Sequence, residues 1–581
     1  MADNFPHREA ALGSRPADLL LANCRLVNVL SGRIEEGVSI AIAGNHVVGI
    51  GTEYEGAERI DLQGQYVYPG LMDAHIHLES SKLTIPECGR AMSRCGTTAV
   101  FADPHEIANV ASLEGVSYQL DTASHNERLS VYFSIPSCVP AIPDPELETF
   151  ASYMGPTKLR TFFNNPWFVS LGEMMNMPGA IYGDPKVLQK LTDIEARGLR
   201  ADGHAPLLSG KPLNAYIYLG ISSDHESTGV AEAQEKLDRG MYLMLREGST
   251  ESNLQDLLPL VNEHNSSRIL LASDDLDPID LAERGHLDHM LRICVANGVP
   301  AIRALQMATI NVATYFRLSR HGAIFPGALA DLVVAPDLTE FRPTAVMRSG
   351  RFVIRDGVEL PAGRPLRSHL RSTMNADLPP VEALAVRAVA GRKLRCITAQ
   401  PGQILTGEAT VSPRLVDGWA QPDPAQDLAK ICVFERHRNS GAFGVGFIQG
   451  LGLKRGAVGS SVCHDSHNII VAGMDDESIR RAAERITAFH GGQVAVAGPA
   501  ERVLPLPVAG LMSDGTFESV VLEEQALHDF CQEALGSSMK RLAAALSFMG
   551  LPVIPELKIT DQGLVRVQAG RYPERVGVWV D

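Results

Sequence analysis

The sequence lacks the features that would place the protein in a membrane, on nucleic acid or outside the cell. No uncharged apolar run approaches the roughly 20 residues that a membrane-crossing helix needs. Charged residues such as Arg8, Glu9, Arg15 and Asp18 interrupt the N-terminal segment and leave no signal-peptide core. Basic residues are in deficit, 52 against 68 acidic ones, so the net charge is −16 and the long-range field repels polyanions. We expect a cytoplasmic protein that binds neither nucleic acid nor membrane.

Cysteine is also scarce for a chain of this length. The nine cysteines form no C-x-x-C pair and are too dispersed for a disulfide framework in 581 residues. We therefore expect reduced thiols packed in the core. Any metal ligands must be sought among His, Asp and Glu.

The overall composition is that of a folded globular protein. Hydrophobic residues make up 45% and charged residues 21% of the chain, which excludes disordered, collagen-like and coiled-coil classes. At about 150 residues per domain, the length allows several domains or one large barrel with additions.

The centre of the chain alternates short apolar runs with longer amphipathic stretches. Eight runs end in polar residues and predict strands at 67–77, 97–106, 129–137, 167–174, 199–206, 220–226, 241–248 and 268–275. Eight strand and helix alternations match a (β/α)8 barrel of the TIM type over residues 68–321. In such a barrel the catalytic groups lie at the carboxyl ends of the strands.

The two flanks of this barrel have the character of short strands and turns. Residues 17–67 and 322–366 are predicted to pair as one small β-sandwich domain built from both flanks. After a linker, residues 370–581 mix strands with helices and predict a further α/β or α+β domain. The predicted fold class is thus α/β with two additions.

Histidines and carboxylates recur at the ends of the predicted strands. His75 and His77 alternate along the first strand, so both imidazoles point the same way and could hold one cation. An isolated H-x-H pair is more often two ordinary histidines. Here the pattern repeats on four other strands, which end in Glu173, His204, His225 and Asp274. This recurrence predicts a metal centre at the barrel mouth.

These motifs carry a resemblance to a known family. The segments are PGLMDAHIHLESS (69–81), ADPHEIANV (102–110), LGEMMNMPG (171–179), DGHAPLLSG (202–210), ISSDHEST (221–228), LASDD (271–275), GAIFPGALADLVV (322–334) and the stretch 430–474. Together they resemble the amidohydrolase superfamily, and within it the bacterial adenine deaminases. The resemblance spans nearly the whole chain.

The resemblance implies a binuclear metal centre. His75 and His77 would bind one metal with Asp274, His204 and His225 would bind the second, and Glu173 would bridge them. Relatives that act on cyclic amides usually bridge the two metals with a carboxylated lysine. Glu173 stands in that place here, which weakens the interpretation of the protein as a hydantoinase or a dihydroorotase. No thiolate is present, which favours Mn²⁺ with Fe²⁺ or Zn²⁺ as alternatives.

The implied reaction is the hydrolysis of adenine to hypoxanthine and ammonia, a step of purine salvage. Two cations lower the pKa of a bridging water, which supplies hydroxide for attack at C6. Asp274 would take the proton and pass it to the departing amino group, which makes Asp274 and Glu173 the catalytic residues. A homodimer is expected from the superfamily resemblance alone.

Further candidates for substrate contacts flank the ligands. Asp103, His105 and Glu106 follow the second strand, where they either face the site or cap a helix. Asp224 and Glu226 flank His225, and one of them could orient its ring.

Three more positions have two readings each. Asp275 follows Asp274 and faces the opposite side unless the strand has already ended. Arg246, followed by Glu247 at the end of the seventh strand, either meets the purine edge or forms a surface ion pair. His464 and His467 in the motif HDSHN either bind an extra metal, lean over the barrel mouth or close a turn.

Two other functions stay open at this point. One is a binuclear hydrolase of another aminopurine, a cyclic amide or an amidine, which would use the same metals. The other is a barrel without catalysis that serves as a scaffold; it predicts missing ligands, whereas all six positions are filled.

Overall fold

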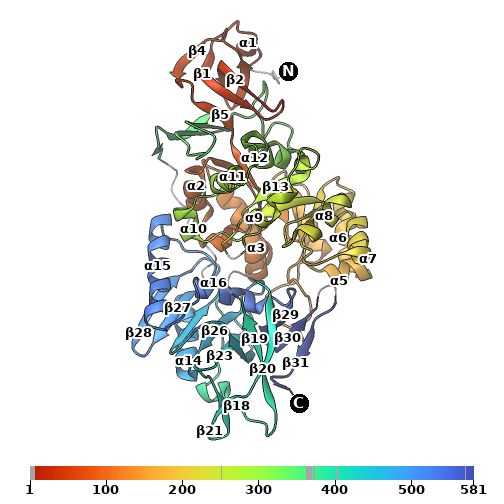
Figure 1. The fold of residues 1–581 in the computed structure, drawn as a ribbon, viewed down its shortest axis with the longest axis vertical. Coiled ribbons are helices and arrows are strands. Elements are labelled where there is room, and N and C mark those ends of the chain that lie inside the picture. The colour runs from red at the N-terminus through yellow and green to blue at the C-terminus, as the bar shows by residue number, and fades with distance from the viewer. Residues whose placement is uncertain are drawn as a thin grey trace.

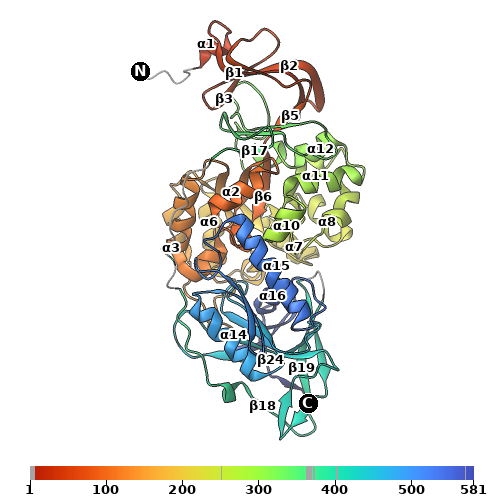
Figure 2. The ribbon, with the colours of Figure 1, turned by 90° about the vertical axis from the view of Figure 1, so that its left-hand side faces the viewer.

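The computed structural model describes residues 7–249, 251–361, 370, 373–400, 404–568 and 571–580. The chain forms three parts that follow one another along the long axis of the molecule (Figure 1). A small β-rich part lies at one end, the barrel lies in the middle, and the C-terminal domain lies at the other end (Figure 2). Among the described residues, no helix combines the length and apolarity that crossing a bilayer requires.

The small β-rich part is one sheet that both flanks of the barrel build. After the short helix α1 (Arg8–Ala11), its strands are β1 (Ala17–Asn28), β2 (Arg33–Ala43), β3 (His46–Ile50), β4 (Gly56–Asp61), β5 (Tyr66–Pro69), β14 (Leu332–Ala335), β15 (Ala345–Arg348), β16 (Arg351–Arg355) and β17 (Val358–Glu359). The flanks meet where β5 and β14 pair antiparallel, with Leu332 opposite Pro69. Residues 362–366, the predicted end of this part, lie outside the described residues. The sandwich and the three predicted domain limits stay predictions.

The middle part contains eight parallel strands, one inside each predicted run. Five form one sheet: β6 (Leu71–Ile76), β7 (Thr97–Ala102), β8 (Ser130–Ile135), β9 (Phe168–Met174) and β10 (Arg200–Gly203). Three form a second: β11 (Ser223–Asp224), β12 (Tyr242–Arg246) and β13 (Ile269–Ala272). Isolated parallel bridges join the sheets at both ends, between Ala201 and Ile221 and between Ile76 and Asp274. The carboxyl ends of all eight strands therefore lie at one mouth.

Helices connect these strands around the outside (Figure 1). They are α2 (Ile85–Ser93), α3 (His105–Ser124), α4 (Pro156–Leu159), α5 (Met177–Tyr182), α6 (Pro185–Glu195), α7 (Gly210–Tyr218), α8 (Val230–Asp238), α9 (Leu254–Leu257), α10 (Pro278–Glu283), α11 (Leu287–Ala296), α12 (Ala301–Met307) and α13 (Ile310–Tyr315). Helix α6 shows why they form. Asp184 caps its start by accepting from the amides of Lys186 and Val187, and Val187, Leu191 and Ile194 recur at helical spacing and are buried.

The C-terminal domain is a nine-stranded, mostly antiparallel sheet with helices packed on it. Its long sheet contains β19 (Lys393–Ala399), β20 (Thr406–Val411), β23 (Leu428–Phe434), β24 (Phe443–Gln449), β25 (Ala457–Ser460), β26 (Ile469–Gly473), β27 (Gly492–Ala497), β28 (Ala500–Pro505) and β32 (Trp579–Val580). Two smaller sheets contain β18 (Val386–Arg387), β21 (Arg414–Val416) and β22 (Trp419–Gln421), and β29 (Glu556–Thr560), β30 (Gly563–Val567) and β31 (Glu574–Val576). The helices are α14 (Asp476–Ala488), α15 (Phe517–Glu533) and α16 (Leu542–Ser547).

Short 3-10 helices complete the structure at Leu78–Ser81, Arg160–Phe162, Leu258–Leu260, Ser266–Arg268, Val381–Leu384 and Phe548–Gly550.

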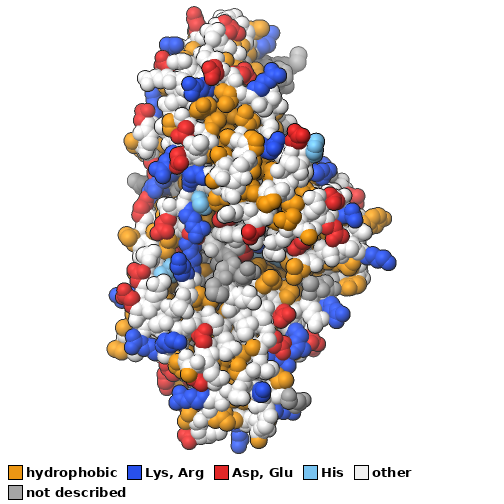
Figure 3. Space-filling view, in the orientation of Figure 1, with side chains coloured by type: hydrophobic (Ala, Val, Ile, Leu, Met, Phe, Trp, Pro, Cys, Tyr) orange, Lys and Arg blue, Asp and Glu red, His pale blue; other side chains and the backbone are white. Residues whose placement is uncertain are grey.

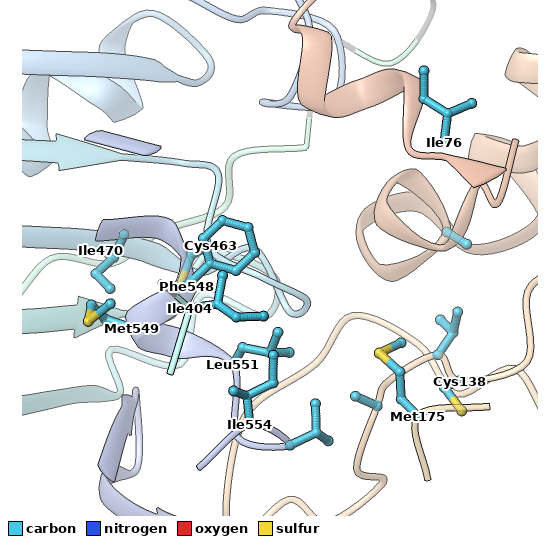
Figure 4. Close-up of a cluster of buried hydrophobic side chains, with 14 of the residues drawn as sticks. Ile76, Cys138, Met175, Ile404, Cys463, Ile470, Phe548, Met549, Leu551 and Ile554 are labelled. Carbon is cyan, nitrogen blue, oxygen red and sulfur yellow. The ribbon is translucent and has the colours of Figure 1, made fainter. Parts of the chain in front are cut away.

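One apolar core runs without a break from the barrel into the C-terminal domain. It includes Ile76 and Met175 of the barrel and Ile404 and Leu551 of the domain. Figure 4 shows Ile404, Leu551 and Ile554 of the C-terminal domain on one side of this cluster and Met175 of the barrel on the other. The domain therefore covers the barrel mouth instead of being tethered at a distance from it.

The outer surface carries charges of both signs. On the face shown in Figure 3, acidic and basic side chains are interspersed over the barrel and the C-terminal domain. On this face the basic residues do not gather into one extended surface of the kind that binds a polyanion.

Candidate functional site

The six predicted ligand residues converge at the mouth of the barrel. His75 lies in β6 and Glu173 in β9, and the other four follow strand ends directly or after one residue. Their exposed fractions lie between 2% and 4%. Four imidazoles and two carboxylates are thus brought together in a buried place: His75, His77, Glu173, His204, His225 and Asp274.

Glu173 lies at the centre of this group, and its two oxygens face different histidines. Oε1 lies 3.4 Å from Nε2 of His77. Oε2 lies 2.7 Å from Nδ1 of His204 and 3.0 Å from Nε2 of His225. One carboxylate therefore connects the histidine of the first strand with those of the fifth and sixth.

The first strand and the eighth strand form the other half of the group. The Nε2 atoms of His75 and His77 lie 3.2 Å apart. Oδ1 of Asp274 lies 3.6 Å from Nε2 of His75 and 3.2 Å from Nε2 of His77. Three donor atoms from two strands thus point at one place.

The charges of the two carboxylates are maintained despite their burial. Burial alone would raise the pKa of Glu173, but His204 and His225 beside it hold that pKa well below its usual range. Burial also opposes ionisation of Asp274, whereas its neighbours His75, His77 and Arg246 hold its pKa well below normal. Both groups are therefore anionic at neutral pH.

This donor set fits divalent cations. Burying two carboxylates is costly unless a positive charge compensates for it. His77 Nδ1 lies 3.1 Å from the carbonyl oxygen of Asp103, so this nitrogen carries the proton and leaves the Nε2 lone pair free to face His75. Nε2 of His204 is buried and has no hydrogen-bond partner among the described residues. Nitrogen and oxygen donors without thiolate suit Mn²⁺, Fe²⁺ and Zn²⁺.

Arg246 is a buried part of the site and not half of a surface ion pair. It is 2% exposed, and its Nη1 donates to Oε1 of Glu226 at 2.5 Å and to Oδ2 of Asp274 at 2.7 Å. Glu226 also approaches His225 Nε2 at 3.4 Å. The guanidinium therefore fixes one oxygen of Asp274 and leaves the other facing the histidines.

Asp103 does not cap helix α3. The helix begins at His105 after Pro104, without a side-chain cap. Instead, Oδ2 of Asp103 accepts a hydrogen bond from the amide of Glu173 at 3.0 Å. A Cβ atom at Gly172 would lie 2.1 Å from this oxygen, so the glycine makes room for the contact. His105 Nδ1 lies 3.5 Å from Glu173 Oε1.

Asp224 lies beside the group but turns away from it. Its Oδ2 accepts from Lys236 Nζ at 2.9 Å and from Ser227 Oγ at 2.7 Å, and Oδ1 accepts from the amide of Ala205. It does not line the pocket at the barrel mouth, which the predicted ligand residues surround. Of the two acids that flank His225, the structure therefore brings only Glu226 into the site.

Asp275 faces the same pocket as Asp274. Strand β13 ends at Ala272, and Asp274 has a left-handed backbone conformation with φ of 58°. The alternation of a strand no longer applies, so both carboxylates line the pocket. Asp275 also contacts Ser80 Oγ. Of the two readings of Asp275, the structure agrees with the one in which the strand has already ended.

The histidines of HDSHN lie over the barrel mouth. His464 Nδ1 lies 2.6 Å from Oε1 of Glu106, and His467 Nε2 contacts Oε2 of the same carboxylate. The amide of Cys463 donates to Nδ1 of His467 at 3.2 Å. Nδ1 of His467 is therefore an acceptor, and Nε2 carries the ring proton of the neutral tautomer and faces the Glu106 carboxylate. Two tail histidines thus hold one barrel carboxylate.

Several residues of the pocket were missed from the sequence. Asp465 lines it together with five apolar side chains, Met175, Ile404, Phe548, Leu551 and Ile554. Met175 lies two residues after Glu173 in a motif that was already noted. The apolar residues of the tail carry no local signal, because they come from segments that only the fold brings together.

Known protein families match both the barrel and the C-terminal domain. The amidohydrolase family model matches residues 66–353, and the adenine deaminase C-terminal domain model matches residues 403–571. An adenine deaminase of Desulfatibacillum aliphaticivorans is 44% identical over 560 residues, 96% of this chain and 97% of that protein. Adenine deaminase 2 of Carboxydothermus hydrogenoformans is 44% identical over 561 residues, with the same coverage.

Sequence similarity at this level over nearly the full length of both proteins establishes common ancestry and a common fold. It confirms the resemblance that the sequence motifs carried. The chain belongs to the adenine deaminase family, within the amidohydrolases.

Proposed function

We propose that this protein hydrolyses adenine to hypoxanthine and ammonia. The observation that supports this best is Glu173, whose two oxygens face His77 on one side and His204 with His225 on the other. A carboxylate in this position suits a pair of cations, and the relatives that share the chain's full length are named adenine deaminases.

We assign the cation ligands as the resemblance implied. His75, His77 and Asp274 would hold one divalent ion, His204 and His225 the second, and Glu173 both. When bound, such a pair supplies hydroxide at neutral pH by lowering the pKa of a coordinated water. Mn²⁺ is the first choice, with Fe²⁺ and Zn²⁺ as alternatives.

Asp274 is the proposed proton carrier. The hydrogen bond from Arg246 to Oδ2 keeps the carboxylate ionised and oriented. It can then accept a proton from the attacking water and deliver it to the amino group at C6, because ammonia leaves far more readily than amide ion. Arg246 acts here through Asp274 and is a positioning residue.

The remaining polar groups of the pocket would position the purine. His105, Glu106, Glu226, Asp275 and His464 all line it. Their donors and acceptors come from both the barrel and the C-terminal domain, so the base would be held between the two. Asp465 adds a further carboxyl whose pKa burial raises to about 7.

A direct assay tests the proposal. Purified protein loaded with Mn²⁺ should release ammonia from adenine with loss of the adenine absorbance, and metal analysis should give two ions per chain. Opening of a cyclic amide without ammonia would instead support the alternative hydrolase. If the metal-loaded protein turns over neither class of substrate, the remaining interpretation is a barrel without catalysis that serves as a scaffold.

A matched variant tests the shared carboxylate. Glu173→Gln keeps the size of the side chain but removes the charge, so bound metal should fall from two ions toward one or none. Unchanged stoichiometry and rate would return Glu173 to an ordinary residue at a strand end. The homodimer, the cytoplasmic location and the place in purine salvage stay predictions.

A further inference from the structure

A second cavity lies where the small β-rich part meets the barrel. Its volume is about 460 Å³, within the roughly 300–1,000 Å³ of pockets that hold small molecules. Arg128, which lines it, precedes strand β8. The cavity therefore lies at the amino ends of the barrel strands, on the side opposite the proposed metal ligands.

Three arginines and one carboxylate line this cavity. The arginines are Arg128, Arg348 and Arg351, and the carboxylate belongs to the exposed Glu127. Arg348 Nε donates to Oγ of Ser130 at 3.2 Å, and its Nη1 donates to two backbone carbonyl oxygens. Its hydrogen bonds to the described residues thus include none to a carboxylate. The lining has an excess of positive charge.

Arg128 is a buried cation whose charge is poorly compensated. It is 4% exposed, its Nη1 donates to the carbonyl oxygen of Val353 at 3.3 Å, and its Nη2 contacts that of Leu360. Nε is buried and has no hydrogen-bond partner among the described residues. Burial lowers the pKa of this guanidinium, and Glu359 offsets that effect only in part. A buried charge is costly unless an opposite charge pairs with it.

The carboxylate that Arg128 does approach is shared with two other arginines. Oε2 of Glu359 lies 3.8 Å from Nη2 of Arg128. The same oxygen accepts from Arg90 Nε at 3.2 Å, and Oε1 contacts Arg94. The segment that continues the chain beyond the cavity, residues 362–369, has the sequence AGRPLRSH and contains no acidic side chain. It cannot supply the missing negative charge.

An oxyanion is the ligand that these groups match. Guanidinium groups stay charged at physiological pH and bind phosphate through paired N–H donors. Asn45 and Ser349 line the same cavity and add an amide and a hydroxyl group. The cavity is larger than one phosphate ion, which leaves space for an organic group beside Phe352.

We propose that this cavity binds a small phosphate-bearing molecule, whose phosphate Arg128, Arg348 and Arg351 hold. The site is separate from the barrel mouth and does not depend on the proposed deamination. Its ligand is a tetrahedral phosphate, carried either as the free ion or as a phosphate monoester. Occupation stabilises the folded chain, because the ligand binds the folded state and pairs with a charge that folding buries.

Thermal unfolding of the full-length, Mn²⁺-loaded protein tests the site. The probes are inorganic phosphate and ribose 5-phosphate, at an ionic strength held constant with chloride so that screening does not change. Tm should rise with at least one probe and saturate. A lower Kd for ribose 5-phosphate identifies the monoester as the ligand, and a lower Kd for phosphate identifies the free ion. No saturable rise with either probe would overturn the proposal.

Arg351→Gln is the first variant, because this side chain is exposed at the start of β16 and its loss leaves the core intact. Loss of one charge-assisted contact should raise the Kd of the tighter probe about 10-fold. Arg355→Gln is the matched control. Arg355 is exposed at the other end of β16 and pairs with Glu58 at 3.3 Å, but it does not line the cavity. Its Kd should equal that of the wild type. An equal loss in both variants would reduce the effect to the general field of the surface and overturn the site.

Arg128→Gln tests the buried charge and should abolish the saturable rise in Tm. If this variant does not fold, Arg348→Gln takes its place, with an expected loss of about 10-fold in affinity. Phosphate that competes with adenine, and that binds Arg351→Gln as tightly as the wild type, would belong to the metal centre and would also overturn the site. The Tm measurement needs no turnover, so a failure of the proposed function leaves this test intact.

Discussion

His77 of the barrel and His467 of the C-terminal domain have opposite ring-nitrogen partners. In the barrel, His77 Nδ1 lies beside the Asp103 carbonyl, so Nε2 keeps a lone pair. In the tail, His467 Nδ1 accepts from the Cys463 amide, so Nε2 carries a proton toward Glu106. The first arrangement suits a cation and the second suits a carboxylate.

Histidine spacing alone therefore does not define a metal site. The partner of the second ring nitrogen decides which role the first can take. The surroundings of each ring also decide its charge. Burial lowers the pKa of His467 to about 4, whereas the Glu106 carboxylate raises the pKa of His464 to about 9 although that ring is buried too. One tail histidine is neutral and the other is cationic.

The largest effect is expected from the barrel histidines. His77→Ala removes a proposed direct ligand, so bound metal should fall and kcat/KM for adenine should drop by at least about 10²- to 10³-fold. His75→Ala should behave in the same way. Metal analysis and the ammonia assay check both. Full metal content with wild-type turnover in either variant would contradict the ligand assignment of the first strand.

A second large effect concerns the proton carrier. Asp274→Asn should lower kcat by about 10²- to 10⁴-fold, the usual contribution of general acid and base catalysis. KM should change less, because the amide can still accept a hydrogen bond from Arg246. Steady-state kinetics with adenine separate the two parameters.

Asp275 is the control for the Asp274 variant. Asp275 lines the pocket as well, and burial raises its pKa, so its charge is less secure than that of Asp274. Asp275→Asn should therefore cost less in kcat and more in KM. A greater loss of kcat in Asp275→Asn than in Asp274→Asn would transfer the proton step to the other residue.

An intermediate effect tests the tail pair. His467→Gln removes the ring that contacts Glu106, and loss of one polar contact to a buried charged group costs about 1.5–3 kcal/mol. Adenine turnover should fall by roughly 10- to 100-fold. Metal content should be unchanged, in contrast to His77→Ala. Loss of metal in His467→Gln would show that both pairs have the same role.

Much of the barrel could be predicted because its signals are local. Each strand is a short apolar run, and each proposed ligand follows such a run, so β6, β9 and β13 could be placed with His75, Glu173 and Asp274 at their ends. The pairing of β5 with β14 was also predicted, because both flanks show strand and turn patterns around the barrel.

The rest depends on distances that no local pattern encodes. The sequence leaves two readings of Arg246, a purine contact and a surface ion pair, and the fold buries it against Glu226 and Asp274. The fold brings Ile404 next to Leu551 although they lie 147 positions apart in the sequence, and nothing in either neighbourhood distinguishes them from other core residues. The sequence leaves two readings of Asp275, because it does not show that the strand ends before Asp274, which has a positive φ.

The smallest effect concerns two buried lysines, one in each region. Lys236 of the barrel donates to Asp224 and Glu232, which raise its pKa against burial. Lys558 of the C-terminal domain has only the carbonyls of Ile404 and Phe548, and burial lowers its pKa from 10.5 to about 7. A neutral amine has two N–H donors, which match the two carbonyls.

The sign of the pH dependence follows from this difference. Between pH 7 and 10.5, Lys558 binds a proton in the unfolded chain but not in the folded one, so the free energy of unfolding rises with pH over that window. Lys558→Met has a similar volume and no proton to lose. The stability of the variant relative to the wild type should therefore fall as the pH rises from 7 to 10, as measured by thermal unfolding at several pH values. A constant difference across that range would mean that Lys558 is charged in the fold, and that the carbonyls of Ile404 and Phe548 hold an ammonium group as the barrel carboxylates hold Lys236.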